Sequence, residues 1–115
     1  ELGTDARGVV VSQVMPFPFS TTTPISREYL DAVSKAGPEA QPNYSSMEGY
    51  LSAKVFAEGL RRAGRNPSRD SLVNALESIQ NANFGGFRVD FSPKDHVASH
   101  FVDLSMLTED GKVRR

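Results

Sequence analysis

The chain has 115 residues, a formal net charge of −1 and no cysteine. Its length fits one small domain or part of a larger one, and no basic run interleaved with aromatic residues points to a nucleic-acid surface. The absence of cysteine excludes a disulfide scaffold and thiolate metal sites, and no apolar run approaches the roughly 20 residues of a membrane span.

A run rich in β-branched residues at 8–15 predicts the first strand. It is apolar on both faces at residues 9–11, as is typical of buried strands in α/β proteins. Pro16 ends the run, because proline cannot donate to a strand ladder. Residues 1–8 lack an initiator methionine and have the character of a loop, so we expect a cut from a longer chain or a processed product.

Two shorter helices flank a longer central one. The first is expected to begin at Thr23, a capping residue followed by Pro24 at the first helical position, and to stop at Gly37. The last starts near Ser68 and presents a single apolar face. That face is formed by Leu72, Val73, Leu76 and Ile79.

The central helix is expected between Asn43 and Gly64, about five turns at 3.6 residues per turn. Ser45 or Ser46 can accept a hydrogen bond from a free amide of its first turn, and Gly64 supplies a left-handed stop. Its apolar residues occupy two nearly opposite sides, which predicts a helix packed between neighbours. One side carries Met47, Leu51 and Val55, and the other carries Phe56, Leu60 and Ala63.

Two glycines lie inside this helix. Gly49 and Gly59 each cost roughly 1 kcal/mol of helix propensity relative to alanine. We therefore expect another part of the chain to approach the backbone closely at both positions.

The C-terminal quarter predicts two strands. Gly85 and Gly86 are expected to form a tight turn, after which residues 87–91 alternate as a half-buried strand. A turn at 92–95 leads to a second strand at 101–107, so that the two form a C-terminal β-hairpin. The fold class is α/β: one strand, three helices and this hairpin, with no obvious neighbour for the first strand except the hairpin.

The sequence offers little catalytic chemistry. His96 and His100 are four residues apart, but they fall in a turn entering a strand and no third ligand is evident. No serine lies in a Gly-x-Ser-x-Gly motif or beside a plausible base. We expect no enzyme, no metal site and no cofactor.

The start of the central helix carries the polar candidates. The helix dipole favours a carboxylate there by about 0.3–1 kcal/mol, which alone could explain Glu48. The alternative is contact with a ligand ammonium or hydroxyl. Tyr50 is similarly open to two interpretations, since a phenol is both packing surface and polar handle.

The order of motifs resembles the C-terminal part of the type I periplasmic binding proteins of the leucine/isoleucine/valine-binding class. These are the solute receptors of branched-chain amino-acid ABC transporters. The likeness covers nearly the whole chain. It is carried by residues 8–16, 44–50, 53–64, 85–93, 95–96 and 101–104.

The resemblance implies a two-lobed receptor that closes on its ligand about a hinge. Residues 1–115 would be one partial domain, with 9–15 and 101–107 as strands that cross the hinge. The ligand would contact Tyr50, with Glu48 and Ser46 within a turn of it. Gln13 and Pro16 would line the hinge side.

The resemblance also implies partners and location. The receptor would be periplasmic, bind an amino acid or related small metabolite, and dock on an ABC permease in the membrane. Much of the recognition of the amino and carboxylate groups would come from a preceding portion, so this chain alone should bind ligand weakly or not at all. Exposed apolar groups at residues 9–11, Phe17 and Phe19 should favour self-association.

The rival interpretation is a self-contained α+β module for ligand sensing or dimerisation. A third is a sensing domain of the same receptor fold attached to a signalling protein. The sequence upstream of Glu1 distinguishes these interpretations.

Overall fold

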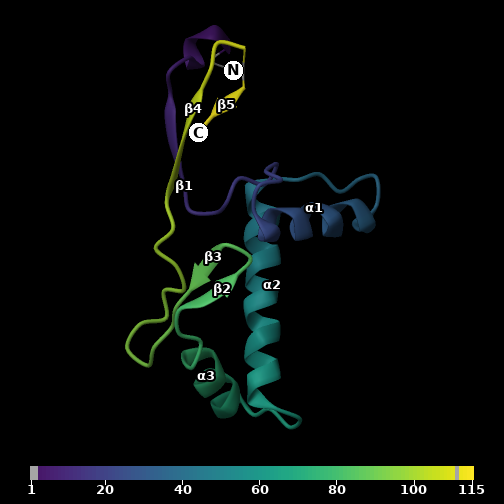
Figure 1. The fold of residues 1–115 in the computed structure, drawn as a ribbon, viewed down its shortest axis with the longest axis vertical. Coiled ribbons are helices and arrows are strands. Elements are labelled where there is room, and N and C mark those ends of the chain that lie inside the picture. Colours follow the sequence, from purple (N-terminus) through teal and green to yellow (C-terminus); the bar gives the residue numbers. More distant parts are fainter. Residues whose placement is uncertain (1–2, 111) are drawn as a thin grey trace.

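A computed structural model describes residues 3–110 and 112–115, and it separates into two parts (Figure 1). Helices α1–α3 and the β2–β3 hairpin form one part, here called the helical body. Strands β1, β4 and β5 form the other, here called the arm, which extends away from the body. The elements are η1 (Gly3–Ala6), β1 (Val10–Gln13), α1 (Pro24–Ala36), α2 (Tyr44–Ala63), α3 (Arg69–Glu77), β2 (Ala82–Phe84), β3 (Phe87–Val89), β4 (Asp103–Leu107) and β5 (Val113–Arg114).

The hydrophobic core lies in the helical body. Side chains from α1, α2 and β3, with one from the loop after α3, form a single buried cluster. Its members are Ile25, Tyr29, Met47, Leu51, Ile79, Phe87 and Val89. The mixed α/β class expected from the sequence is therefore confirmed.

The predicted helix ends agree with the structure, with one correction. Thr23 caps α1 with Pro24 in its first turn, and Ser68 caps α3. At α2 the cap is Asn43, whose side-chain oxygen accepts a hydrogen bond from the amide of Ser46 at 2.9 Å. The expectation that Ser45 or Ser46 would itself be the acceptor is wrong, because Asn43, directly before the first helical residue, already has the extended backbone of a cap.

The expectation of close approach at both helix glycines holds for one of them. A Cβ at Gly59 would lie 2.5 Å from the Cδ2 atom of Leu76, so α3 packs directly against this part of α2. At Gly49, apart from its two chain neighbours and the nearby backbone of α2, no heavy atom of the described residues lies within 4 Å of the same position.

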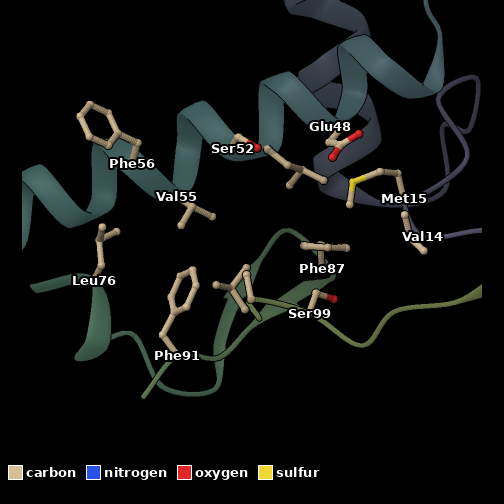
Figure 2. A pocket seen from close by; sticks show the side chains of 13 residues that line it. Val14, Met15, Glu48, Ser52, Val55, Phe56, Leu76, Phe87, Phe91 and Ser99 are labelled. Atoms are coloured by element: carbon tan, nitrogen blue, oxygen red, sulfur yellow. The ribbon is translucent and has the colours of Figure 1, made fainter. Parts of the chain in front are cut away.

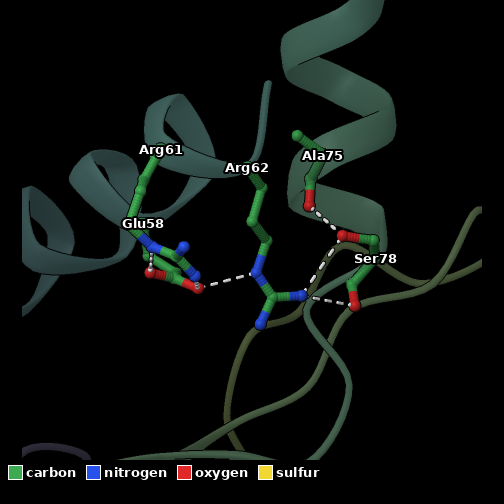
Figure 3. A network of polar contacts seen from close by, with 5 residues as sticks. All are labelled: Glu58, Arg61, Arg62, Ala75 and Ser78. Atoms are coloured by element: carbon green, nitrogen blue, oxygen red, sulfur yellow. Dashed lines mark hydrogen bonds and ion pairs between the residues drawn. The ribbon is translucent and has the colours of Figure 1, made fainter. Parts of the chain in front are cut away.

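Polar contacts also join α2 to α3 (Figure 3). The guanidinium of Arg62 donates to the backbone carbonyl of Ser78 at 2.8 Å and to the carboxylate of Glu58 at 2.7 Å. Hydrogen bonds from Arg61 and Arg62 lower the pKa of Glu58 to about 2. The end of α3 is thereby tied to the last turns of α2.

The strand pairing differs from the expected C-terminal hairpin. Strand β3 pairs with β2, whereas β4 pairs with β1 on one side and β5 on the other, all antiparallel. The hairpin partner of β3 was missed because Ala82 and Asn83 have low strand propensity and read as a loop. The tight turn at Gly85 and Gly86 is confirmed, with positive φ at both residues.

This turn also touches the start of α1. The amide of Ile25 donates to the carbonyl of Gly85 at 3.0 Å. A Cβ at Gly85 would lie 2.6 Å from that same amide nitrogen. Only glycine fits here, and the contact fixes the β2–β3 hairpin against α1.

No helix within the described residues has the length and apolar composition needed to cross a bilayer.

Candidate functional site

A largely apolar hollow of about 470 Å³ lies between α2, the end of α3, β3 and the segment that follows β1. Figure 2 shows its two ends: Phe56, Leu76 and Phe91 lie at one, and Glu48, Val14 and Met15 lie at the other. The remaining lining residues are Leu51, Ser52, Val55, Phe87, Val89, Ala98 and Ser99.

Glu48 supplies the charge at the second end. Its side chain is exposed in the second turn of α2, and no hydrogen bond or ion pair to its carboxylate is found among the residues that the structure describes. Gln13 ends β1 directly before Val14, and it lies opposite Asp103 in the register of β1 and β4. Glu48 therefore lines the hollow, whereas Gln13 precedes a lining residue and does not line the hollow itself.

The other two predicted residues face α1. The Tyr50 hydroxyl lies 3.5 Å from a carboxylate oxygen of Glu28, and its ring meets the Tyr29 ring edge-on with centroids 5.7 Å apart. Partial burial raises the pKa of Tyr50, and the nearby charge of Lys54 opposes this rise. Lys54 forms an ion pair with the same Glu28 carboxylate.

Ser46 takes part in the hydrogen-bonded contact between α1 and α2. Its hydroxyl lies 2.6 Å from that of Tyr29, whose side chain is only 1% exposed. The Tyr29 hydroxyl also accepts a hydrogen bond from the Asn43 amide at 2.9 Å. Ser46 therefore has a structural partner inside the chain, whereas Glu48 has a carboxylate available to a cation.

A cluster at the junction of body and arm escaped the sequence analysis. The Arg115 guanidinium lies 5.5 Å from the centre of the Phe17 ring and donates to Asp103 at 2.7 Å. Phe17 also packs against Phe19 and Tyr44. Burial, the largest cause, raises the pKa of Tyr44. No local pattern predicts this cluster, because its members come from four separate segments. The one indication in the sequence is that Phe17 and Phe19 lie two residues apart.

The two histidines do not form a metal centre. The Nε2 atom of His96 lies 2.9 Å from a carboxylate oxygen of Glu77. Within residues 3–110 and 112–115 there is no group of three or more histidine, cysteine, aspartate or glutamate residues placed to hold a metal ion.

Comparisons with known proteins identify the family. A family profile described as periplasmic binding protein matches residues 1–112. The chain is 34% identical to a substrate-binding periplasmic protein from Ralstonia solanacearum, with a TM-score of 0.84 over 96% of this chain. It is 32% identical to an extracellular ligand-binding receptor from Verminephrobacter eiseniae, with a TM-score of 0.85 over 96% of this chain.

A third solved structure has a more specific description. The chain is 31% identical, with a TM-score of 0.85 over 99% of its length, to a possible leucine/isoleucine/valine-binding protein from Rhodopirellula baltica. In all three cases this chain spans only 31–32% of the length of the solved chain. The search of curated proteins found no match.

The chain therefore belongs to the periplasmic binding protein family, and the resemblance seen in the sequence is confirmed. Its mixed α/β fold matches part of a lobe of these proteins. The family and these solved relatives are described as periplasmic or extracellular binding proteins, which supports an extracytoplasmic location.

Proposed function

We propose that this chain is part of the solute-binding component of an ABC transporter. Its ligand is a branched-chain amino acid or a related small metabolite, and its partner is a membrane permease. The observation that carries this proposal is the likeness to a possible leucine/isoleucine/valine-binding protein over 99% of the chain. The name of that relative supports the ligand class, and family membership supports transport.

The proposed ligand contacts come from the N-terminal half of α2 and the end of β1. Glu48 offers a carboxylate to a ligand ammonium, in keeping with its exposure and its position beside the hollow. Tyr50 offers an aromatic face and a hydroxyl, while Ser46 and Gln13 offer hydrogen bonds. Tyr50 and Ser46 face α1 rather than the hollow, so the proposed site extends around the start of α2.

The arm supplies the proposed hinge. Residues 9–15 and 101–107 contain β1 and β4, which pair antiparallel in the arm: β1 leads toward the body and β4 leads back from it. In a receptor with two lobes, two such strands can bend together as the lobes close. Ligand bound between the lobes shifts the equilibrium from open to closed, and the closed form docks on the permease.

The chain by itself binds ligand weakly or not at all, because the proposed contacts leave one side of the ligand in water. It self-associates through β1 and the residues on either side of it, where Val9, Val10 and Phe19 are exposed, because exposed strand edges recruit partners. Light scattering tests this: a dimer or larger species supports the proposal, and a monodisperse monomer contradicts it.

Reading the gene upstream of Glu1 separates the proposal from its rival. An open frame through another lobe to a signal peptide supports a transport receptor. A start codon immediately before Glu1 favours a self-contained module for ligand sensing or dimerisation. The product that contains the whole frame is then titrated with leucine, isoleucine and valine by calorimetry. Ligand at a hundred times its Kd should stabilise the protein by about 2.7 kcal/mol, and no binding of these or related metabolites contradicts the proposed ligand class.

A further inference from the structure

Two loops join the arm to the helical body. Residues 14–23 lead from β1 to α1, and residues 90–102 lead from β3 back to β4 (Figure 1). Among the residues that the structure describes, no hydrogen bond or ion pair joins β1, β4 or β5 to a helix. The angle between arm and body therefore depends on the contacts that side chains make where the two parts meet.

Arg115 makes a contact that spans this junction. It follows β5, and its Nε atom donates to the Asp103 carboxylate at 2.7 Å. Asp103 begins β4 and lies opposite Gln13, in the pair of β1 and β4 nearest to the body. The guanidinium also lies 5.5 Å from the centre of the Phe17 ring, in the loop that leads to α1. Asp103 thus holds the guanidinium from the arm, while Phe17 meets it from the side of the body.

Aromatic side chains carry this contact on to α2. The centre of the Phe17 ring lies 5.4 Å from that of Phe19 and 6.4 Å from that of Tyr44, the first residue of α2. Burial raises the pKa of Tyr44, and the positive charge of Arg115 opposes this rise because the guanidinium lies close to the start of the helix. A continuous contact therefore runs from β4 through Arg115 and Phe17 to α2.

Two prolines restrain the loop that carries Phe17. Pro16 and Pro18 flank it on either side, and both are buried. Proline fixes φ near −65°, and the Ser20 amide donates to the Phe17 carbonyl at 3.1 Å. The Phe17 ring is therefore held in a defined direction rather than presented on a free loop.

The contact of Arg115 is partly open to solvent. The side chains of Arg115 and Asp103 are 39% and 27% exposed. An ion pair at such a site and a guanidinium over an aromatic face each contribute a modest attraction. The combination can favour one angle of the arm without locking it.

We propose that Arg115, Asp103 and Phe17 form a clasp that holds the arm at one angle to the helical body. When the clasp opens, the arm turns about residues 14–19 and 98–102. Arg115 is a positioning residue, because it acts through the angle of the arm and not through contact with a ligand. The inference goes beyond the proposed function, since it holds in the chain without ligand and whichever ligand is bound.

Distances between spin labels test the clasp, and the chain has no cysteine of its own to interfere. Nitroxides on Asp5→Cys and Ala57→Cys, both at exposed positions, report the distance from arm to body. A second pair on Ala36→Cys and Ala57→Cys reports a distance within the body. Labelled chains are diluted with unlabelled chains, so that only distances within one molecule are measured. Pulsed electron paramagnetic resonance then gives the distribution of each distance with and without Arg115→Gln.

The matched control is Arg114→Gln. Arg114 carries the same charge one residue earlier, and successive residues of a strand face opposite sides. The arm-to-body distribution should be one narrow peak, and Arg115→Gln should broaden it at least about twofold because the arm then samples more angles. Arg114→Gln should leave the peak unchanged, and the distance within the body should stay the same throughout.

Three results would overturn the proposal. The first is a broad arm-to-body distribution before any substitution, and the second is an equal width in Arg115→Gln and Arg114→Gln. The third is a broadened distance within the body in Arg115→Gln, which would mean that the substitution unfolds the body rather than releases the arm.

Phe17→Leu tests the other half of the clasp and leaves Arg115 in place. It keeps an apolar side chain but removes the ring face that attracts the guanidinium, so it should broaden the arm-to-body peak. Phe19→Leu, in the neighbouring ring of the same cluster, should broaden it less. Phe17→Leu combined with Arg115→Gln should broaden it no more than either change alone, because both break one contact. Additive broadening, or no effect of Phe17→Leu, would contradict the clasp.

Discussion

The helical body and the arm use similar apolar residues with different results. In the body, Ile25, Tyr29 and Met47 are at most 1% exposed. In the arm, Val10 and Leu104 lie on one face of the sheet and are 58% and 59% exposed. The difference lies in packing: the body folds helices and a hairpin onto one another, whereas nothing among the described residues covers this face of the arm. Apolar sequence alone does not make a core.

The largest expected effect compares one residue from each part. Ile79→Ala should lower the free energy of unfolding by about 2–5 kcal/mol, because it removes a fully buried side chain and leaves a cavity. Leu104→Ala in the arm should change it by less than about 0.5 kcal/mol. Denaturant unfolding of the isolated chain measures both, and equal losses would show that the arm has a core of its own.

Two glycines give the next contrast. Gly85→Ala should lower the free energy of unfolding by about 1–3 kcal/mol, since φ is +62° and the new methyl group would meet the Ile25 backbone. Gly49→Ala in open helix surface should raise it by up to about 1 kcal/mol. Thermal melts of both variants test the pair. A stabilising Gly85→Ala would mean that the hairpin turn is not held against α1.

Tyr29 and Tyr50, whose rings meet edge-on, should respond differently to loss of the hydroxyl. Tyr29→Phe should cost about 1 kcal/mol, because it leaves the backbone amide of Asn43, the cap of α2, without its partner. Tyr50→Phe should leave the stability of the isolated chain nearly unchanged, since its contact with exposed Glu28 is 3.5 Å long. A cost for Tyr50→Phe as large as that for Tyr29→Phe would assign Tyr50 a structural role and weaken its place in the ligand site.

The smallest effect concerns pH. Hydrogen bonds from Arg61 and Arg62 lower the pKa of Glu58 from 4.5 to about 2 in the folded chain. The stabilisation from a lowered carboxylate pKa is fully present above the unfolded value and is lost as pH falls toward the folded value. Glu58→Gln should therefore reduce the decline in stability between about pH 4.5 and pH 2. Identical pH profiles for wild type and Glu58→Gln would refute the role of this contact.

Local chemistry made much of the body predictable from sequence. Thr23 with Pro24, Ser68 and Gly64 mark helix ends through backbone geometry that depends on neighbouring residues alone. The strand partners were not predictable in the same way. The pairing of β1 with β4 joins residues 90 to 96 positions apart, and the weak strand propensity of Ala82 and Asn83 concealed β2.

The sequence indicated the start of α2 as the candidate site but not which side of the helix each residue faces. The start of α2 was identified because polar residues gather there. Which side of the helix each one faces depends on packing, so Glu48 lies by the hollow while Tyr50 lies against Tyr29. The predicted burial of α2 on two sides was wrong for one of them, since Met47 and Leu51 are buried whereas Phe56 and Leu60 are exposed.

Hydrogen exchange tests the contrast between body and arm most directly. It is measured by mass spectrometry on the isolated chain, at a concentration low enough for light scattering to show a monomer. Amides of α2 should exchange at least about a hundredfold more slowly than those of β1 and β4, because only α2 belongs to a packed core. Protection of β1 and β4 equal to that of α2 would show that the arm is stable uncovered, and would contradict the account.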